Sequence, residues 1–82
     1  MTKVLNYTLL FRSEPEGGYT VVVPSLPGCV TYGKNLSEAK KMAKDAIEGY
    51  LVSLEKHKEP IPTEESVFFS NINVSARLSA YA

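Results

Sequence analysis

The most constraining feature of the sequence is a single amphipathic helical pattern that occupies residues 36 to about 57. At about 100° per residue, eight apolar side chains of this segment fall within an arc of roughly 140°, with Val52 opposite them, so the helix has one main apolar face. Such a face must be buried against another layer, and the rest of the chain offers strand-like segments for that layer. The apolar residues of the arc are Leu36, Ala39, Ala43, Ala46, Ile47, Tyr50, Leu51 and Leu54.

Both ends of this helix are marked by local signals. Asn35 is a candidate N-cap, and Glu38 follows three residues later, which makes an Asn variant of the capping box. At the other end, the imidazole of His57 suits the helix dipole, and Pro60 prevents continuation. We therefore expect the helix to begin at Leu36 and to end near His57.

Four further segments have the alternation or the β-branched composition of strands. Residues 4–12 and 18–23 flank a turn rich in proline and glycine, and we expect them to form a hairpin. A short third strand is predicted over residues 29–33, and a fourth over residues 66–74, after the helix. The order β-β-β-α-β predicts the α+β class, with one helix packed on a small, mostly antiparallel sheet.

Size and charge limit what the chain can do. Its 82 residues form a single domain over residues 1–82, because a second core needs roughly another 50 residues. Nine Lys and Arg residues balance nine Asp and Glu residues, which argues against a general nucleic-acid coat and against a membrane-surface protein. The first residues lack the apolar core of a signal peptide, so we expect a cytoplasmic protein.

No constellation of residues predicts catalysis. The carboxylates fall in turns, on the helix or in the connector that follows it, whereas a metal-dependent nuclease needs carboxylates that converge on one cation. His57 is the only histidine, and the lone Cys29 is expected to be a small hydrophobic residue of a strand. We expect no catalytic residue, no metal and no cofactor, and a nuclease is the least favoured alternative.

The loop between the second and third predicted strands is the best candidate for a binding surface. Residues 26–29 have proline and glycine where a type II turn requires them. Rigid prolines and nearby tyrosines lose little conformational entropy when a partner binds. The alternative, that these residues only turn the chain and pack against the helix, stays open. The candidate partner-binding residues are Tyr19, Pro24, Leu26, Pro27, Gly28 and Tyr32.

Several short motifs occur in a fixed order along the chain, and their combination is more specific than any one of them. They are Gly17-Gly18-Tyr19-Thr20-Val21, Val23-Pro24-Ser25-Leu26-Pro27-Gly28-Cys29, Gly33, Glu38-Ala39, Ala46-Ile47 and Ile61-Pro62. From about residue 4 to residue 62, this pattern closely resembles the HicB-like antitoxin family. The resemblance implies a β-β-β-α-β domain, often described as a partial RNase H-like fold, which agrees with the order of elements predicted above.

The resemblance implies an antitoxin rather than an enzyme. Members of the family bind a small HicA-like toxin, a ribonuclease with a double-stranded-RNA-binding fold that cleaves mRNA with a histidine, and they cover its active site. Many relatives continue into a helix-turn-helix or ribbon-helix-helix domain that binds operator DNA. Residues 75–82 are too few for such a domain, so we expect no C-terminal DNA-binding domain and no direct DNA binding by this chain alone.

Two further expectations concern partners. An unpaired sheet edge and a mostly apolar second strand predict a homo-oligomer, either a dimer or a tetramer. If no toxin is encoded nearby, the alternative function is that of an orphan interaction or regulatory module of the same fold, with another protein or a small-molecule ligand as its partner.

Overall fold

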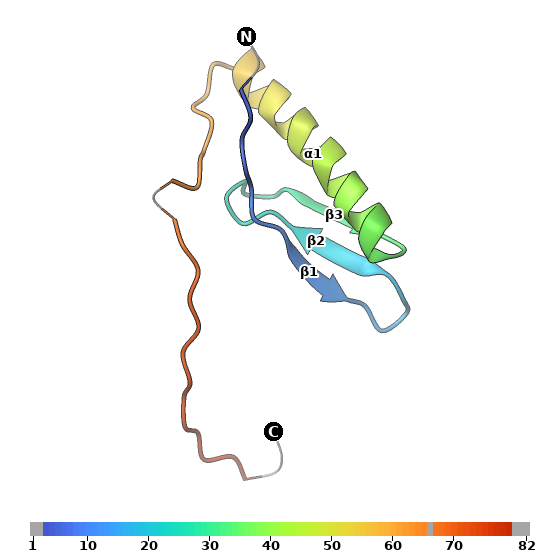
Figure 1. Cartoon of the computed structure of the whole chain (residues 1–82), viewed down its shortest axis with the longest axis vertical. Coiled ribbons are helices and arrows are strands. Elements are labelled where there is room, and N and C mark those ends of the chain that lie inside the picture. The colour runs from blue at the N-terminus through green and yellow to red at the C-terminus, as the bar shows by residue number, and fades with distance from the viewer. Residues whose placement is uncertain (1–2, 66, 80–82) are drawn as a thin grey trace.

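The computed structural model describes residues 3–65 and 67–79, and it has three strands followed by one long helix (Figure 1). The strands are β1 (Leu10–Ser13), β2 (Tyr19–Val22) and β3 (Val30–Gly33), and the helix is α1 (Leu36–Lys56). The sheet is antiparallel in the order β1-β2-β3, and α1 lies across one face of it. The predicted α+β class is therefore confirmed.

The strand register decides which side chains face the helix. Phe11, Val21 and Thr31 lie opposite one another and share the helix-facing side. Val21 is fully buried against Ala39 and Ala43 of α1. Small residues on both surfaces bring the helix close to the sheet, so the core is thin and depends on close backbone approach.

Gly33 is where this approach is tightest. A Cβ atom placed on Gly33 would overlap the backbone of Ala39. The absence of a side chain on Gly33 therefore allows the first turn of α1 to rest directly on β3. The same first turn is capped as predicted, because the Asn35 Oδ1 atom accepts a hydrogen bond of 2.8 Å from the backbone N–H of Glu38. The Glu38 carboxylate accepts from the backbone N–H of Lys34 at 2.8 Å and not from that of Asn35, so the second hydrogen bond of the predicted capping box is made one residue earlier.

A second core cluster lies beyond the end of β2. Val23, Leu26 and Cys29 are buried there, and the loop that carries them folds under the helix. Cys29 donates its backbone N–H to the carbonyl oxygen of Leu26 at 2.9 Å, and Gly28 between them has a φ of 80°. This is the predicted type II turn. The partly buried residues around the cluster are Tyr7, Leu9, Ala46, Ile47, Tyr50 and Leu51.

The first strand is shorter than predicted. The sequence predicts a strand over residues 4–12, whereas β1 spans Leu10–Ser13, and residues 3–9 run beside α1 (Figure 1). Alternation alone does not distinguish these two parts, because Tyr7 and Leu9 pack against the core cluster under the helix instead of facing a neighbouring strand. The Tyr7 hydroxyl donates to the carbonyl oxygen of Pro62 at 2.6 Å, which ties the segment to the chain after α1.

The fourth predicted strand, over residues 66–74, is not formed by the part of it that the structure describes. Residue 66 lies outside the described residues, and residues 67–74 are extended but are paired with no strand. They leave the body of the molecule (Figure 1). The physical reason is that β-prone composition specifies an extended chain but not its neighbour, and a strand needs a neighbour to satisfy its backbone.

The tail, defined here as residues 67–79, also determines the shape of the molecule. The Cα radius of gyration is 16.3 Å, whereas a compact chain of this length has about 12 Å. The longest dimension is 56 Å. Within residues 3–65 and 67–79, no helix is both long enough and apolar enough to cross a membrane.

Candidate partner-binding surface

The structure separates the two tyrosines that the sequence analysis grouped together. Tyr32 lies opposite Thr20 in the β2–β3 register, while Tyr19 lies opposite Gly33. Neighbouring residues of a strand point to opposite faces, so the two rings lie on opposite sides of the sheet. Tyr19 packs against the helix-facing core cluster, and Tyr32 is half exposed on the other side. A single contact surface includes only one of them.

The loop residues also divide between core and surface. Leu26 is fully buried and holds the loop against the helix. Pro27 and Gly28 are exposed, and Pro24 is half-buried. The Tyr50 hydroxyl donates to the carbonyl oxygen of Pro27 at 2.8 Å, so α1 fixes the tip of the loop. The exposed part of the loop is therefore a rigid corner at the end of the β2–β3 hairpin.

The face of the sheet that points away from α1 carries exposed apolar side chains. Leu10, Val22 and Val30 lie opposite one another in the register, and Tyr32 follows on the same side. Val30 is 55% exposed, and Leu10 and Tyr32 are exposed to a similar extent. We call this set, made up of Leu10, Val22, Val30 and Tyr32, the open sheet face. A contiguous apolar patch of this kind is typical of a protein–protein contact.

Tyr32 is held in position by the β1–β2 turn. Its hydroxyl donates to the carbonyl oxygen of Gly17 at 2.9 Å. A Cβ atom on Gly18 would overlap the Tyr32 hydroxyl, so glycine at this position lets the ring lie over the turn. An aromatic side chain that is fixed in this way has little rotamer freedom left to lose when a partner binds.

Carboxylates of the β1–β2 turn flank the same end of the open sheet face. The Thr20 hydroxyl and the Arg12 guanidinium both donate to the Glu14 carboxylate, the latter at 3.2 Å. These hydrogen bonds, that of Thr20 above that of Arg12, lower the pKa of Glu14 below its ordinary value. Glu16 is exposed two residues further along the turn. Arg12 lies on the open sheet face and offsets the charge of Glu14, so Glu16 leaves this end with a net negative charge, while the apolar row Leu10, Val22 and Val30 lies toward the other end.

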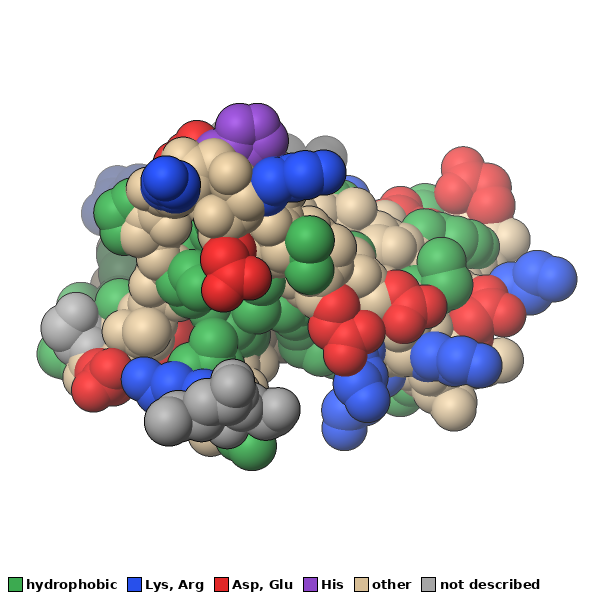
Figure 2. Space-filling model, turned by 90° about the horizontal axis from the view of Figure 1, so that it is seen from above, with side chains coloured by type: hydrophobic (Ala, Val, Ile, Leu, Met, Phe, Trp, Pro, Cys, Tyr) green, Lys and Arg blue, Asp and Glu red, His purple; other side chains and the backbone are tan. Residues whose placement is uncertain are grey.

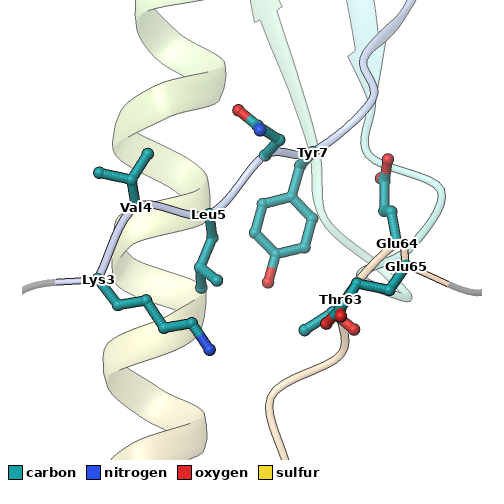
Figure 3. Close-up of a pocket in the computed structure, with 8 residues that line it drawn as sticks. Lys3, Val4, Leu5, Tyr7, Thr63, Glu64 and Glu65 are labelled. Carbon is teal, nitrogen blue, oxygen red and sulfur yellow. The ribbon is translucent and has the colours of Figure 1, made fainter.

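A pocket lies between the N-terminal segment that precedes β1 and the connector that follows α1 (Figure 3). The Glu64 carboxylate accepts hydrogen bonds from the Thr8 backbone N–H and hydroxyl, both at 2.8 Å, and from the Ser25 hydroxyl at 2.9 Å. These bonds, with the backbone N–H as the largest cause, lower the pKa of Glu64. Burial first and the Glu64 charge second raise the pKa of Tyr7. At this pocket, the hydrogen bonds of Tyr7 and Glu64 tie the N-terminal segment and the loop after β2 to the connector.

The one cysteine of the sequence, Cys29, lies in the core. Burial raises the pKa of the Cys29 thiol, which keeps it protonated within the core. Within the described parts of the chain, no three His, Cys, Asp or Glu residues lie close enough together to hold a metal ion. On the face seen in Figure 2, acidic and basic side chains are interspersed, with hydrophobic side chains between them. This mixture gives that face no field of a single sign.

Comparison with known proteins agrees with this picture of a small binding domain. A family model described as "HicB_like antitoxin of bacterial toxin-antitoxin system" matches residues 7–75. The chain belongs to the HicB-like antitoxin family.

Relatives of this HicB-like chain occur in archaea and bacteria. A UPF0150 protein of Thermoplasma acidophilum is 44% identical over 62 residues, which cover 76% of this chain and 90% of the relative. A UPF0150 protein of Synechocystis is 37% identical over 65 residues, which cover 79% of this chain and 82% of the relative. A UPF0150 protein of Helicobacter pylori is 52% identical over 42 residues, or 51% of this chain and 58% of the relative. Most of the length of the first two relatives is therefore shared with this HicB-like domain.

The sequence analysis placed its candidate surface on the loop and missed most of the open sheet face. Only Tyr32 belongs to both. The available signal was the composition of β2 and its neighbours, because a strand that is apolar on both sides needs cover on both sides. Leu10 interrupts the polar side of the first predicted strand for the same reason. One helix covers one side only, so the second apolar side remains exposed.

Proposed function

We propose that this chain is an antitoxin that binds a small HicA-like, mRNA-cleaving toxin in the cytoplasm and covers its active site. Membership of the HicB-like antitoxin family supports a binding role in place of an enzymatic one. The observation that carries the proposal further is the open sheet face, because an apolar patch with one fixed aromatic residue and an acidic end fits a protein partner.

The charge of the face matches the chemistry of such a toxin. A protein that cleaves mRNA must attract phosphates, so the region around its active site is expected to be basic. Glu16 and the neighbouring turn offer negative charge beside Tyr32, and apolar Val30 lies further along the same face. In this proposal the apolar row supplies affinity, and the net negative charge of the turn speeds and orients association.

The loop contributes at the rim of the proposed contact. Pro24, Pro27 and Gly28 lie at the end of the β2–β3 hairpin and remain accessible to a partner. Leu26 and Tyr19 act indirectly in this proposal, since their side chains hold the loop and the sheet against α1. Operator DNA is not a proposed partner of this chain alone, because its charges balance and the one helix of the described residues packs its apolar face on the sheet.

The test takes a HicA-like toxin as the partner and measures mRNA cleavage in the presence of increasing antitoxin. We expect Val30→Glu to weaken inhibition at least about tenfold, because it puts a desolvated carboxylate into the contact. Val52→Glu is the matched control, since Val52 on the outer side of α1 is 63% exposed and Val30 is 55% exposed. Both variants are compared by thermal melting to confirm that the fold is retained.

Unchanged inhibition by Val30→Glu, with a loss in Val52→Glu, would move the contact from the sheet to the helix. If the toxin fails to co-purify with the wild-type chain, the toxin partnership is wrong and the orphan-module function replaces it. A gel-shift titration with the gene's own promoter tests the exclusion of DNA, and sequence-specific binding by the purified chain would contradict it.

A further inference from the structure

The tail combines the composition of a strand with the exposure of an interface. Phe68 and Ile72 are 87% and 86% exposed, and the segment over residues 67–74 contains no charged residue. Aromatic and β-branched residues favour an extended, half-buried chain, and here nothing in the described parts of the same chain buries them. Leaving this much apolar surface in water is unfavourable, so the segment requires a partner.

The edge of the sheet formed by β1 lacks a neighbouring strand, which is what the tail could supply. In the order β1-β2-β3, the outer edge of β1 has no strand beside it, and all four of its residues are exposed. Among the described elements, α1 packs against β3 and β2 but not against β1. Phe11 on the helix-facing side and Leu10 on the open side are therefore both uncovered at this edge. A strand added beyond β1 would cover both residues and pair the free backbone groups.

The geometry of the chain directs its own tail away from this edge. Glu64 is fixed to Thr8 and Ser25, so the tail begins beside the start of β1. From there residues 67–79 run outward, away from the sheet (Figure 1). Eight residues of extended chain span about 26 Å, which exceeds the length of a four-residue strand. An outstretched arm beside an empty edge is the arrangement in which two identical chains exchange arms.

We propose that residues 67–74 of one chain pair with the β1 edge of a second copy, so that the two chains exchange a fourth strand reciprocally. Each copy then donates one strand and receives one, which gives a closed two-fold dimer. The occupant is a second copy of this chain, since the segment and the edge it fits occur in the same sequence. The inference goes beyond the proposed function, because it needs no toxin.

The first experiment measures the mass of the full chain by light scattering across a micromolar dilution series. We expect twice the 9.0 kDa mass of the single chain. The double variant Phe68→Ser/Phe69→Ser should associate at least about tenfold more weakly, because it removes two large apolar side chains from the proposed pairing. Leu78→Ser is the matched control, since Leu78 is an exposed apolar residue of the tail outside the pairing segment. It should dimerise like the wild type.

The second experiment separates exchange between chains from folding of the tail onto its own sheet. A chain with Cys29→Ala and Ser75→Cys carries a spin label next to the segment, and it is refolded together with ¹⁵N-labelled wild-type chain. We expect the Leu10–Ser13 amide signals of the ¹⁵N chain to broaden. The ¹⁵N chain carries no spin label, so any broadening comes from a label on the other chain. Absence of broadening in the mixture, a monomeric wild-type chain, or a double variant that dimerises normally would each overturn the exchange.

Discussion

The body of the molecule, residues 3–65, and the tail contain the same kinds of apolar residues. The body buries many of them, whereas the tail leaves them exposed. In the body, Val21, Val23 and Leu26 are almost completely removed from water by a helix that lies over the sheet. In the tail, Phe68 and Ile72 are almost completely exposed. Composition is therefore not what distinguishes the two regions. The difference is the presence of a second layer.

The comparison shows how stability and interaction are divided within a small chain. Burial by α1 supplies the body with an internal driving force, and close contact at Gly33 and Ala39 makes that burial efficient. The tail and the open sheet face have no internal layer, so their apolar surface is available only to other molecules. If this division holds, substitutions in the body alter folding, and substitutions in the tail alter association.

The sharpest test of this division replaces one leucine in each region. Leu26→Ala should lower the free energy of unfolding by about 2–5 kcal/mol, because it leaves a cavity among Val23, Cys29 and the helix. Leu78→Ala should change it by less than about 0.5 kcal/mol, since Leu78 is exposed. Urea unfolding of both variants gives the two values. Equal losses would mean that the tail contributes to the folding core.

A second prediction tests the close approach of helix and sheet. Gly33→Ala should destabilise by about 1–3 kcal/mol, because its Cβ overlaps the backbone of Ala39 and the helix must move outward. Gly49→Ala is the control within α1. Its Cβ meets nothing within 4 Å, so it should stabilise by about 0.5–1 kcal/mol through helix propensity. Opposite signs in thermal melting support the contact, and a neutral Gly33→Ala would contradict it.

The third prediction separates backbone geometry from packing within the body. Gly28→Val should cost about 1–2 kcal/mol, because valine is strained at the φ of 80° that the turn requires. Space is not the cause, since a Cβ on Gly28 meets nothing within 4 Å. Gly28→Asn should recover most of the loss, because asparagine tolerates this conformation better. Equal melting temperatures for the valine variant and the wild type would show that the turn relaxes without cost.

The smallest expected effect lies at the junction between the two regions. Glu64→Gln should cost about 1 kcal/mol near neutral pH, because it weakens charge-assisted hydrogen bonds from Thr8 and Ser25. The folded-state pKa of Glu64 lies below its ordinary value of 4.5, so its contribution is present above that value and is lost as the pH falls through the folded pKa. The difference between wild type and variant should therefore shrink in acid. Glu65→Gln, at the exposed neighbour, is the control, and a difference that grows in acid would refute the role of Glu64.

Local signals made much of the body predictable. The helix from Leu36, its Asn35 cap and the type II turn at Gly28 each depend on residues within a few positions of one another. The residues that make such short-range interactions are close together in the sequence, and the interactions form with the same geometry in many tertiary contexts. The family motifs also lie in this part of the chain, which is why the resemblance and the structure agree on the order β-β-β-α.

Pairing and exposure were decided only by the tertiary structure. The sequence assigns residues 4–12 and 66–74 to strands, but only the three-dimensional arrangement shows that Tyr7 and Leu9 serve the helix side and that the tail has no strand beside it. The tertiary structure also separated the candidate site residues, because the strand register puts Tyr19 and Tyr32 on opposite faces of the sheet. Glu64 meets Thr8 across 56 positions of sequence. Such contacts depend on which surfaces remain available after the local elements have packed, and no pattern of neighbouring residues encodes that.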